Sequence, residues 1–377
     1  MADPSDVDSA HQTPDWRILL WMPRGGQMPG GHVVQIDKTA RALEEMGLQV
    51  VRDFSSEPEL TDIDLVHGFG LTSTEIRDCH RRRVPVTMST IYWERSYRSD
   101  GPDQRLGARS IAGRAVRAAR FAGAALRGRS SLIQASLGAM ATELEIFSAY
   151  ESADLLLPNA VGEAESIKRD LGVSTPMIPV PNGVDPLSFV EPTNSFEDRR
   201  YVLFVGRIDP HKNQLGLIRA LRGSGLPLVI AGDDHPHHPR YSERCRAEGE
   251  GWVTFAGQVP HDSAELSDLY QGARVHVLPS WFETTGLVSL EAALSGCSVV
   301  STSRGHAKEY LSDLALYCNP ADPASILSAV QRSWSTPPSP MLRQRVLERY
   351  TWKQVAIRTI AGYGSLLEQW SVDSRLD

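Results

Sequence analysis

The chain has 377 residues, a length that suits about two globular domains. Hydrophobic residues make up 41% of the sequence and charged residues 23%, which excludes a disordered or fibrous chain. The formal net charge of -7 disfavours a general nucleic-acid-binding protein, because the basic surface that such a protein needs is missing. No apolar run approaches the ~20 residues that cross a bilayer.

Residues 1–15 are polar and acidic, without the basic and apolar regions of a signal peptide. We interpret them as a disordered leader and expect a cytoplasmic protein. The four cysteines are widely scattered, so they predict ordinary reduced thiols. Asp62–Asp64 and Asp233–His238 contain metal-binding residue types, but the first leads into a strand and the second fits a loop. No metal site is therefore predicted.

Residues 16–185 predict an α/β domain. Short apolar runs alternate with helical segments, a pattern typical of a parallel sheet covered on both faces. The predicted strands are Arg17–Met22, Leu48–Val51, Leu65–Gly68, Pro85–Ser89 and Ala153–Asn159, and a helix is predicted from Gly31 to Met46.

A glycine-rich turn, Pro23–His32, follows the first predicted strand. Glycine lets a backbone approach a ligand closely, and the pair Gly30 and Gly31 at a helix start is suited to meet a phosphate. The alternative is a tight turn without a ligand. The turn lacks the G-x-G-x-x-G spacing, which disfavours a nicotinamide-dependent oxidoreductase.

The segment Arg105–Arg129 contains seven arginines and no acidic residue. Arg114, Arg117 and Arg120 fall on one face of a predicted helix, beside a stripe that is mostly alanine. Such a helix can rest on an anionic membrane surface or hold an anionic, lipid-linked acceptor. The alternative is a solvated helix packed on its own domain.

Residues 186–200 are polar and contain an acidic cluster, which predicts an interdomain linker. Residues 201–355 predict a second α/β domain, and residues 356–377 a helix that we expect to pack back toward the N-terminal domain. The predicted strands are Tyr201–Val205, Leu228–Gly232, Val253–Gly257, Ala273–Leu278 and Ser298–Thr302.

Two carboxylates flank a turn after the strand Ala273–Leu278: Glu283 precedes a predicted helix and Glu291 lies within it. The first amides of a helix have no intrahelical acceptor and carry partial positive charge, so they can hold a phosphate. Glu291 lies roughly 7 Å beyond Gly286 along the axis, a reach that suits a ribose. The alternative is that both carboxylates are solvated. The amides predicted to hold the phosphate are those of Thr285, Gly286, Leu287 and Val288.

Gly206 and Arg207 directly follow a predicted strand, and Lys212 follows in the next turn. Arginine offers a planar fork and lysine a point charge, and both suit phosphate. Fixed cations stabilise the negative charge that grows on a departing phosphate. The alternative is that each is an ordinary surface cation.

These features resemble family-four retaining glycosyltransferases, in which two glutamates are separated by seven residues and a Gly-Arg and a Pro-x-Lys element follow an earlier strand. The resemblance covers most of residues 200–370. It implies the GT-B fold, in which two Rossmann-like doubly wound parallel-sheet domains face each other across a cleft. It also implies a nucleotide diphosphate sugar as co-substrate, without a metal or other cofactor.

The resemblance also implies roles for individual residues. Arg207, Lys212 and the helix start would bind the diphosphate, Glu291 the ribose, and Glu283 would lie near the donor sugar. Glu283, Arg207 and Lys212 are the catalytic candidates. Gly206, Gly30 and Gly31 would border the donor.

The acceptor side departs from the family, because no histidine follows the strand Pro85–Ser89. His67, at the end of the preceding strand, could face the cleft, although a lone histidine at a strand end more often has a structural role. The remaining acceptor candidates are Tyr92, Trp93 and Glu94, whose aromatic members suit the apolar faces of sugars.

The resemblance thus implies a retaining hexosyltransferase of bacterial polysaccharide, lipopolysaccharide or glycolipid biosynthesis. It would act on a glycan or lipid-linked acceptor, in the cytoplasm or peripherally on the inner face of the membrane. The alternative is a non-catalytic sugar-nucleotide-binding or scaffold subunit of a glycan assembly system.

Overall fold

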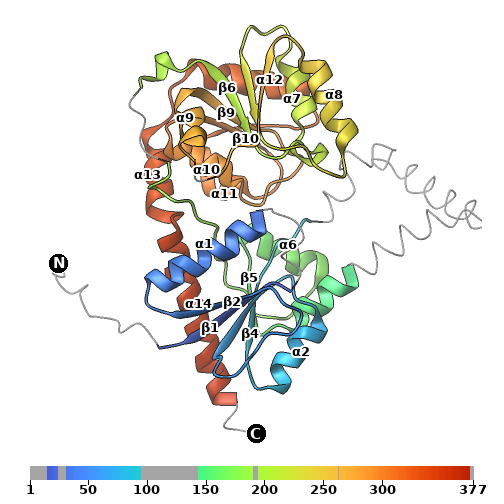
Figure 1. Ribbon diagram of the computed structural model, residues 1–377, viewed down its shortest axis with the longest axis vertical. Coiled ribbons are helices and arrows are strands. Elements are labelled where there is room, and N and C mark those ends of the chain that lie inside the picture. Colours follow the sequence, from blue (N-terminus) through green and yellow to red (C-terminus); the bar gives the residue numbers. More distant parts are fainter. Residues whose placement is uncertain (1–14, 24–30, 95–142, 190–193, 262, 374–377) are drawn as a thin grey trace, which may run out of the picture.

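The computed structural model describes residues 15–23, 31–94, 143–189, 194–261 and 263–373. Most of the predicted leader, Gly30 and the segment Arg105–Arg129 lie outside these residues. The described residues form two α/β domains, each built around its own sheet (Figure 1). All strand pairs in both sheets are parallel, which confirms the predicted α/β architecture.

The N-terminal sheet has the strand order β2-β1-β3-β4-β5. Helices α1 and α14 pack on one face, and α2, α6 and the helical residues 143–152 pack on the other. Parallel strands end at the same edge, so the segments after β3, β4 and β5 meet there. The bounds are β1 Arg17–Trp21, α1 Gly31–Glu45, β2 Gln49–Asp53, β3 Leu65–Phe69, α2 Ser73–Arg81, β4 Val86–Ser89, β5 Leu155–Leu157 and α6 Val161–Leu171.

The C-terminal sheet has the order β11-β10-β9-β6-β7-β8. Helices α9, α10, α11 and α13 cover one face, and α7, α8 and α12 cover the other. The bounds are β6 Tyr201–Val205, α7 Gln214–Leu221, β7 Leu228–Ala231, α8 Pro239–Gly249, β8 Val253–Gly257, α9 Ala264–Gly272, β9 Ala273–Leu278, α10 Leu287–Leu294, β10 Ser298–Thr302, α11 Ala307–Leu311, β11 Leu316–Cys318, α12 Pro323–Ser335, α13 Pro340–Arg349 and α14 Trp352–Asp373; the short 3-10 helices are η2 Phe196–Asp198, η3 Pro210–Lys212 and η4 Ser312–Leu314.

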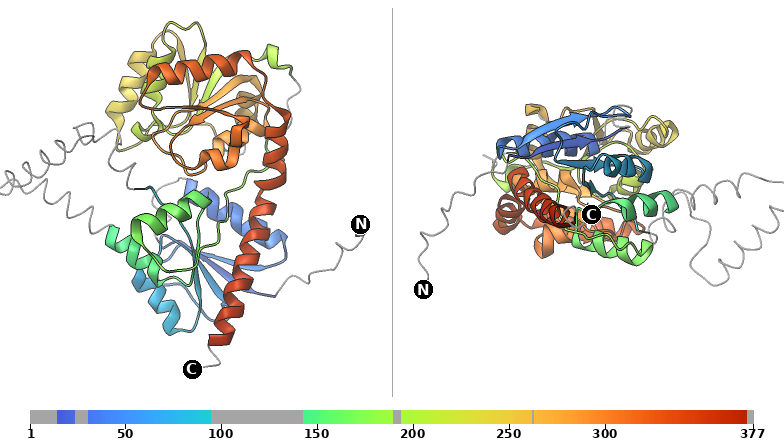
Figure 2. Two further views of the ribbon diagram at one scale, coloured as in Figure 1. Left: turned by 180° about the vertical axis from the view of Figure 1, so that it is seen from behind. Right: turned by 90° about the horizontal axis from the view of Figure 1, so that it is seen from below.

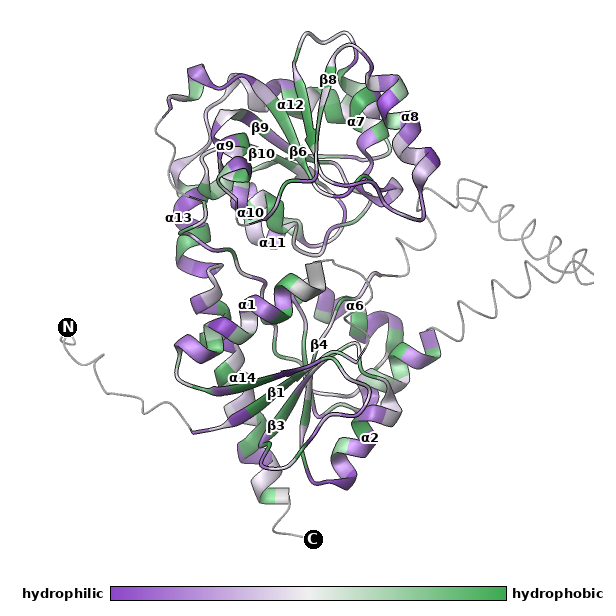
Figure 3. Ribbon diagram, viewed as in Figure 1, coloured by the Kyte–Doolittle hydropathy of each residue, from purple (hydrophilic) through white to green (hydrophobic). Residues whose placement is uncertain are grey.

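The central strands are apolar on both faces because helices cover both sides of each sheet. All residues of β3 and β10 are buried, and all of β1 after its first residue. In Figure 3 mostly hydrophobic strands lie between helices that carry both hydrophobic and hydrophilic residues. Burial at about 25 cal/mol per Å² of apolar area is the main source of stability for such a core.

Two chain crossings join the domains, and they run beside each other. The Val184 amide donates to the Tyr350 carbonyl at 2.8 Å, and Val184 pairs with Thr351 as a parallel bridge. A Cβ at Gly183 would lie 2.8 Å from the Trp352 amide nitrogen, so this close approach requires glycine. The second crossing continues into α14, which begins at Trp352.

Helix α14 returns to the N-terminal domain and packs there beside α1, as Figure 2 shows (red). Its buried residues Val355, Ala356 and Tyr363 lie in the same cluster as Ile18 and Leu20 of β1. The core of the N-terminal domain is therefore completed by a segment that follows the whole C-terminal domain in sequence.

Candidate active site

The carboxyl ends of β6 and β9 bring the predicted cations and carboxylates to one place. The two strands pair in parallel, with Val202 opposite Val275 after a register shift at Tyr201, so the segments that follow them lie side by side. Gly206 follows β6 with a φ of 142°, and a Cβ at Gly232 would lie 2.1 Å from the Gly206 carbonyl oxygen. Both positions therefore need glycine.

An ion pair joins the two segments. Lys212 Nζ lies 2.6 Å from Glu283 Oε1, and the Glu283 side chain is only 8% exposed. Burial opposes ionisation of Glu283, but the charge of Lys212, followed by that of His211, lowers its pKa below the ordinary value. Glu283 is thus a charged carboxylate held in a largely dry site.

The backbone of Glu283 is fixed by the loop between β10 and α11. The Glu283 amide donates to the Arg304 carbonyl at 3.2 Å, and the His306 amide donates to the Glu283 carbonyl at 2.7 Å. A Cβ at Gly305, which has a φ of 90°, would lie 2.1 Å from the Glu283 carbonyl oxygen. These contacts fix the backbone from which the Glu283 side chain extends.

Helix α10 begins beside this carboxylate. Gly286 is its N-cap, in the left-handed region with φ 72° and ψ 62°, and no described side chain caps the helix by a hydrogen bond. The amides of Leu287 and Val288 come first in α10, where helix geometry supplies no intrahelical acceptor. This start has the partial positive charge and the free donors that an anion requires.

Arg207 adds a partly buried cation to the same edge. Its Nε is buried and has no hydrogen-bond partner among the described residues. A buried donor without an acceptor costs free energy, so such an atom is typical of a site completed by a ligand. The Arg207 carbonyl accepts from Gln214 Nε2 at 2.7 Å, which fixes the backbone of this turn.

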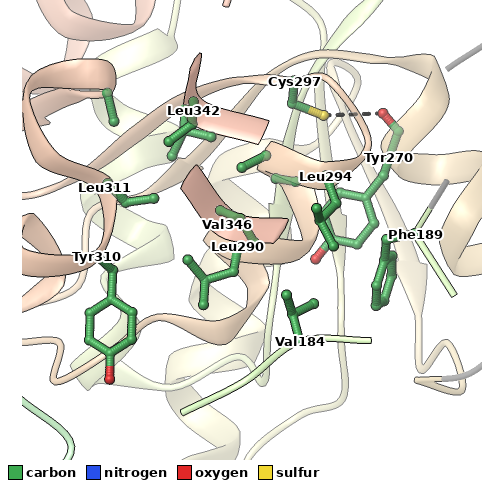
Figure 4. Packing of buried hydrophobic residues seen from close by; sticks show 14 of the residues in the cluster. Val184, Phe189, Tyr270, Leu290, Leu294, Cys297, Tyr310, Leu311, Leu342 and Val346 are labelled. Atoms are coloured by element: carbon green, nitrogen blue, oxygen red, sulfur yellow. Dashed lines mark hydrogen bonds between the residues drawn. The ribbon is translucent and has the colours of Figure 1, made fainter. Parts of the chain in front are cut away.

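Glu291 lies on α10 and faces α9. One of its oxygens lies 2.7 Å from His261 Nε2, and the other accepts from the Tyr270 hydroxyl at 2.8 Å. The Phe189 ring contacts the rings of both His261 and Tyr270 edge-on, and Figure 4 shows Phe189 beside Tyr270. A ribose hydroxyl would therefore join an existing network. Sequence analysis missed His261, Tyr270 and Phe189, because no local pattern marks them.

The His67 side chain is buried and holds two hydrogen-bond partners. Its Nδ1 lies 2.6 Å from the Tyr363 hydroxyl of α14, and its Nε2 lies 2.8 Å from Ser89 Oγ. Burial lowers its pKa to about 3, so the ring is neutral. Of the two roles open for His67, the structure places it in the structural one.

Tyr92 also belongs to the interior. Its ring is buried in the core of the N-terminal domain, and its amide donates to Glu163 Oε1 at 2.7 Å. The Tyr92 hydroxyl lies 3.2 Å from Asp170 Oδ2. As with His67, these contacts correct the expectation of direct acceptor contact.

Trp93 and Glu94 are the acceptor candidates that remain accessible. The Trp93 ring is 42% exposed and stacks on His211 with centroids 4.8 Å apart and an interplanar angle of 4°. His211 directly precedes Lys212, so this stack brings the N-terminal domain beside the ion pair. Glu94 lies 3.2 Å from Arg169. Sequence analysis missed the role of His211.

The remaining observations concern the glycine pair, metal ligands and membrane-crossing helices. Gly31 is the first residue of α1, while Gly30 lies outside the described residues. Within the described ranges, no group of three or more histidine, cysteine, aspartate or glutamate residues is arranged to hold a metal ion. In that same part of the chain, every helix is too short or too polar for a bilayer-crossing segment.

Comparison with known proteins relates the domain that carries this site to a family. Residues 199–335 match the family model described as "Glycosyl transferases group 1". The O-antigen chain mannosyltransferase B of Escherichia coli is 30% identical over 182 residues, which are 43% of this chain and 45% of that protein. An uncharacterized glycosyltransferase of Methanocaldococcus jannaschii is 30% identical over 257 residues, 60% of this chain and 63% of that protein. The chain thus spans about half the length of these curated relatives.

Solved structures resemble the whole fold. Sucrose-phosphate synthase from Thermosynechococcus elongatus has a TM-score of 0.71 at 18% identity and covers 94% of this chain and 100% of its own. HepE from Anabaena, solved with UDP and glucose, has a TM-score of 0.63 at 15% identity and covers 93% and 100%. At these identities, the likeness shows the arrangement of the two domains and not the substrate.

Proposed function

Since residues 199–335 form a domain of the glycosyl transferases group 1 family within a GT-B fold, we propose that this protein is a retaining hexosyltransferase. Its donor is a nucleotide diphosphate sugar, and its acceptor is a hydroxyl of a glycan or of a lipid-linked glycan. The proposed setting is bacterial polysaccharide, lipopolysaccharide or glycolipid biosynthesis.

The observation that carries this proposal is the ion pair of Lys212 and Glu283 beside the start of α10, with Arg207 and its buried Nε on the adjoining turn. A diphosphate leaving group gains negative charge as the sugar bond stretches. Positive groups fixed in a dry site stabilise that charge without having to reorganise. Lys212, Arg207 and the α10 amides are arranged for this task.

The proposed step breaks the bond between the sugar C1 and the phosphate oxygen. The acceptor oxygen forms its bond to C1 on the same face, and its proton passes to the departing phosphate oxygen. Glu283 orients the donor sugar and stabilises positive charge that develops on the ring, and Glu291 holds the ribose. Trp93 supplies an apolar ring face for the acceptor sugar.

The donor class is supported by HepE, whose structures contain UDP or UDP-glucose. The first test is a panel of nucleotide sugars in a thermal-shift assay, followed by measurement of nucleoside diphosphate release with glycan acceptors. We expect one donor to raise the Tm and to support transfer, with the anomeric configuration retained in the product NMR spectrum. We expect transfer to persist in EDTA, because protein groups supply the positive charge. Inversion of the anomeric centre or loss of activity in EDTA would contradict the respective part of the proposal.

A non-catalytic sugar-nucleotide-binding subunit is the second candidate. The acceptor side favours it, because the side chain of His67 is engaged by Tyr363 and Ser89 and is not available to an acceptor. Both candidates bind the donor, but only the enzyme breaks its sugar–phosphate bond. Tight donor binding without hydrolysis or transfer, tested with lipid-linked and soluble glycans, would favour the subunit.

A further inference from the structure

Helix α11 of the C-terminal domain contacts the N-terminal domain with two consecutive side chains. The Glu309 carboxylate accepts hydrogen bonds from the amides of Val161 (2.8 Å) and Gly162 (2.7 Å) at the start of α6. The Tyr310 hydroxyl donates to the carbonyl of Asn159, which follows β5. α11 therefore joins the carboxyl edge of one sheet to the other domain.

The Tyr310 hydroxyl also reaches the turn before α10. It accepts hydrogen bonds from the Asn182 amide (3.1 Å) and from the Thr285 hydroxyl (3.2 Å). Thr285 Oγ1 in turn accepts from the Asn182 side-chain amide at 3.1 Å. One buried hydroxyl thus uses its proton and both lone pairs together. In Figure 4 the Tyr310 ring extends from the end of the core cluster near Leu311, with its oxygen directed away from the cluster.

We propose that Tyr310 is a positioning residue that couples the approach of the two domains to the geometry of the Thr285 turn. The inference rests on the proposed function, which assigns that turn to the donor diphosphate. When the domains separate, the Tyr310 hydroxyl loses its acceptor, the Asn159 carbonyl. The Tyr310 oxygen, to which the Thr285 hydroxyl donates, is then no longer fixed in position. By reciprocity, a donor that orders the Thr285 turn stabilises the closed arrangement of the domains.

The test is Tyr310→Phe, which keeps the ring packed 4.7 Å from Tyr350 and removes only the hydroxyl. Tyr350→Phe is the matched control, because its hydroxyl donates to the Glu309 carbonyl at 3.0 Å within the C-terminal domain. We expect Tyr310→Phe to lower kcat by about tenfold to a hundredfold, because three buried groups lose their partner. The Kd for UDP or the matching nucleoside diphosphate should change less than ~3-fold, since most diphosphate contacts remain, and the control should change neither quantity beyond that.

A double-mutant cycle that combines Tyr310→Phe with Thr285→Val distinguishes coupling between these two residues from a purely structural role of Tyr310. If Tyr310 acts through Thr285, the double variant should lose no more kcat than the worse single variant. The inference would be overturned if the kcat losses of the two single variants multiplied in the double variant, or if Tyr310→Phe had the same kcat as the control. Either result would leave the proposed function intact. Wild-type protein that neither binds nor turns over a nucleotide sugar would overturn both. If the Tyr310→Phe variant failed to fold, as judged by the absence of a thermal unfolding transition, an unchanged kcat in Thr285→Val would still overturn the coupling.

Discussion

At the scale of single residues, the ion pair of Lys212 and Glu283 is both a structural contact and a candidate catalytic group. Removing one partner of a buried pair leaves an unpaired charge and destabilises the fold, whereas removing both leaves no such charge. Stability and activity therefore have to be measured separately at this site.

Arg207→Ala and Lys212→Ala should each lower kcat/KM, measured by steady-state transfer kinetics. The decrease should correspond to a loss of about 2–4 kcal/mol of transition-state stabilisation. The double variant Lys212→Met with Glu283→Gln should recover the Tm lost in Lys212→Met without recovering activity. Lys308→Ala is the control, because its exposed ammonium pairs with Asp313 at the surface. A normal kcat/KM in either single cation variant would remove that cation from the diphosphate site.

The two carboxylates should affect different kinetic constants. Glu291→Gln should mainly raise the donor KM, because a ribose contact is made equally in the ground and transition states. Glu283→Gln should mainly lower kcat, because its charge acts where the sugar reacts. Equal effects of the two substitutions on both constants would show that the assigned roles are wrong.

Glu163 provides a pH test of the N-terminal domain. Burial raises its pKa from 4.5 to about 7, although the amides of Tyr92 and Asn159 and the Thr90 hydroxyl donate to it. A raised pKa means that the folded state binds the proton more tightly. Its stabilising contribution is fully present below pH 4.5 and is lost as the pH rises through about 7.

We therefore expect the difference in unfolding free energy between wild type and Glu163→Gln to fall by about 3 kcal/mol across this window. Urea unfolding at a series of pH values measures it. A constant offset between the two proteins would show that Glu163 is ionised throughout, held so by its three hydrogen-bond donors.

At the scale of elements, the start of α10 depends on one glycine. A Cβ at Gly286 would be strained by the φ of 72° and would lie 3.1 Å from Leu278 Cδ2. Gly251, on the loop before β8, has a φ of 82° with open space around it, so it isolates the backbone strain.

Gly286→Ala and Gly251→Ala should each cost about 1 kcal/mol of stability in urea unfolding, because both force alanine into the left-handed region. Gly286→Ala alone should also weaken nucleoside diphosphate binding, measured by calorimetry, because it displaces the first amides of α10. Equal diphosphate affinity in both variants would show that the helix start does not hold the anion.

The local part of this site was predictable from sequence, and the long-range part was not. The change from strand to helix periodicity around Gly286 predicts β9, the turn and α10, because the signal lies within about twenty consecutive residues. The contact of Tyr310 with Asn159 joins residues 151 positions apart and leaves no periodic trace. Strand β11 was missed because its three residues, Leu-Tyr-Cys, lack the continuous leucine run that marks the equally short β5.

At the scale of the whole molecule, the charge of -7 opposes adsorption to anionic membranes, so any attraction has to come from one basic face. The segment Arg105–Arg129 lies outside the described residues, and its membrane role stays a prediction from sequence.

Replacing Arg114, Arg117 and Arg120 together with Gln should abolish sedimentation with phosphatidylserine vesicles at low salt, because each charge near the surface adds about 1 kcal/mol. Donor binding by the C-terminal domain should stay unchanged, which a thermal-shift assay with the donor verifies. Wild-type protein that ignores such vesicles would favour a soluble acceptor.

The path of α14 has a consequence for biosynthesis. Domains usually fold in the order in which the ribosome releases them. Here the apolar face around Ile18 and Leu20 is covered by Val355, Ala356 and Tyr363, which emerge only after the entire C-terminal domain. The domain that is translated first is therefore the one that is finished last. Until α14 arrives, the nascent chain exposes part of one apolar face of the N-terminal sheet to chaperones and proteases.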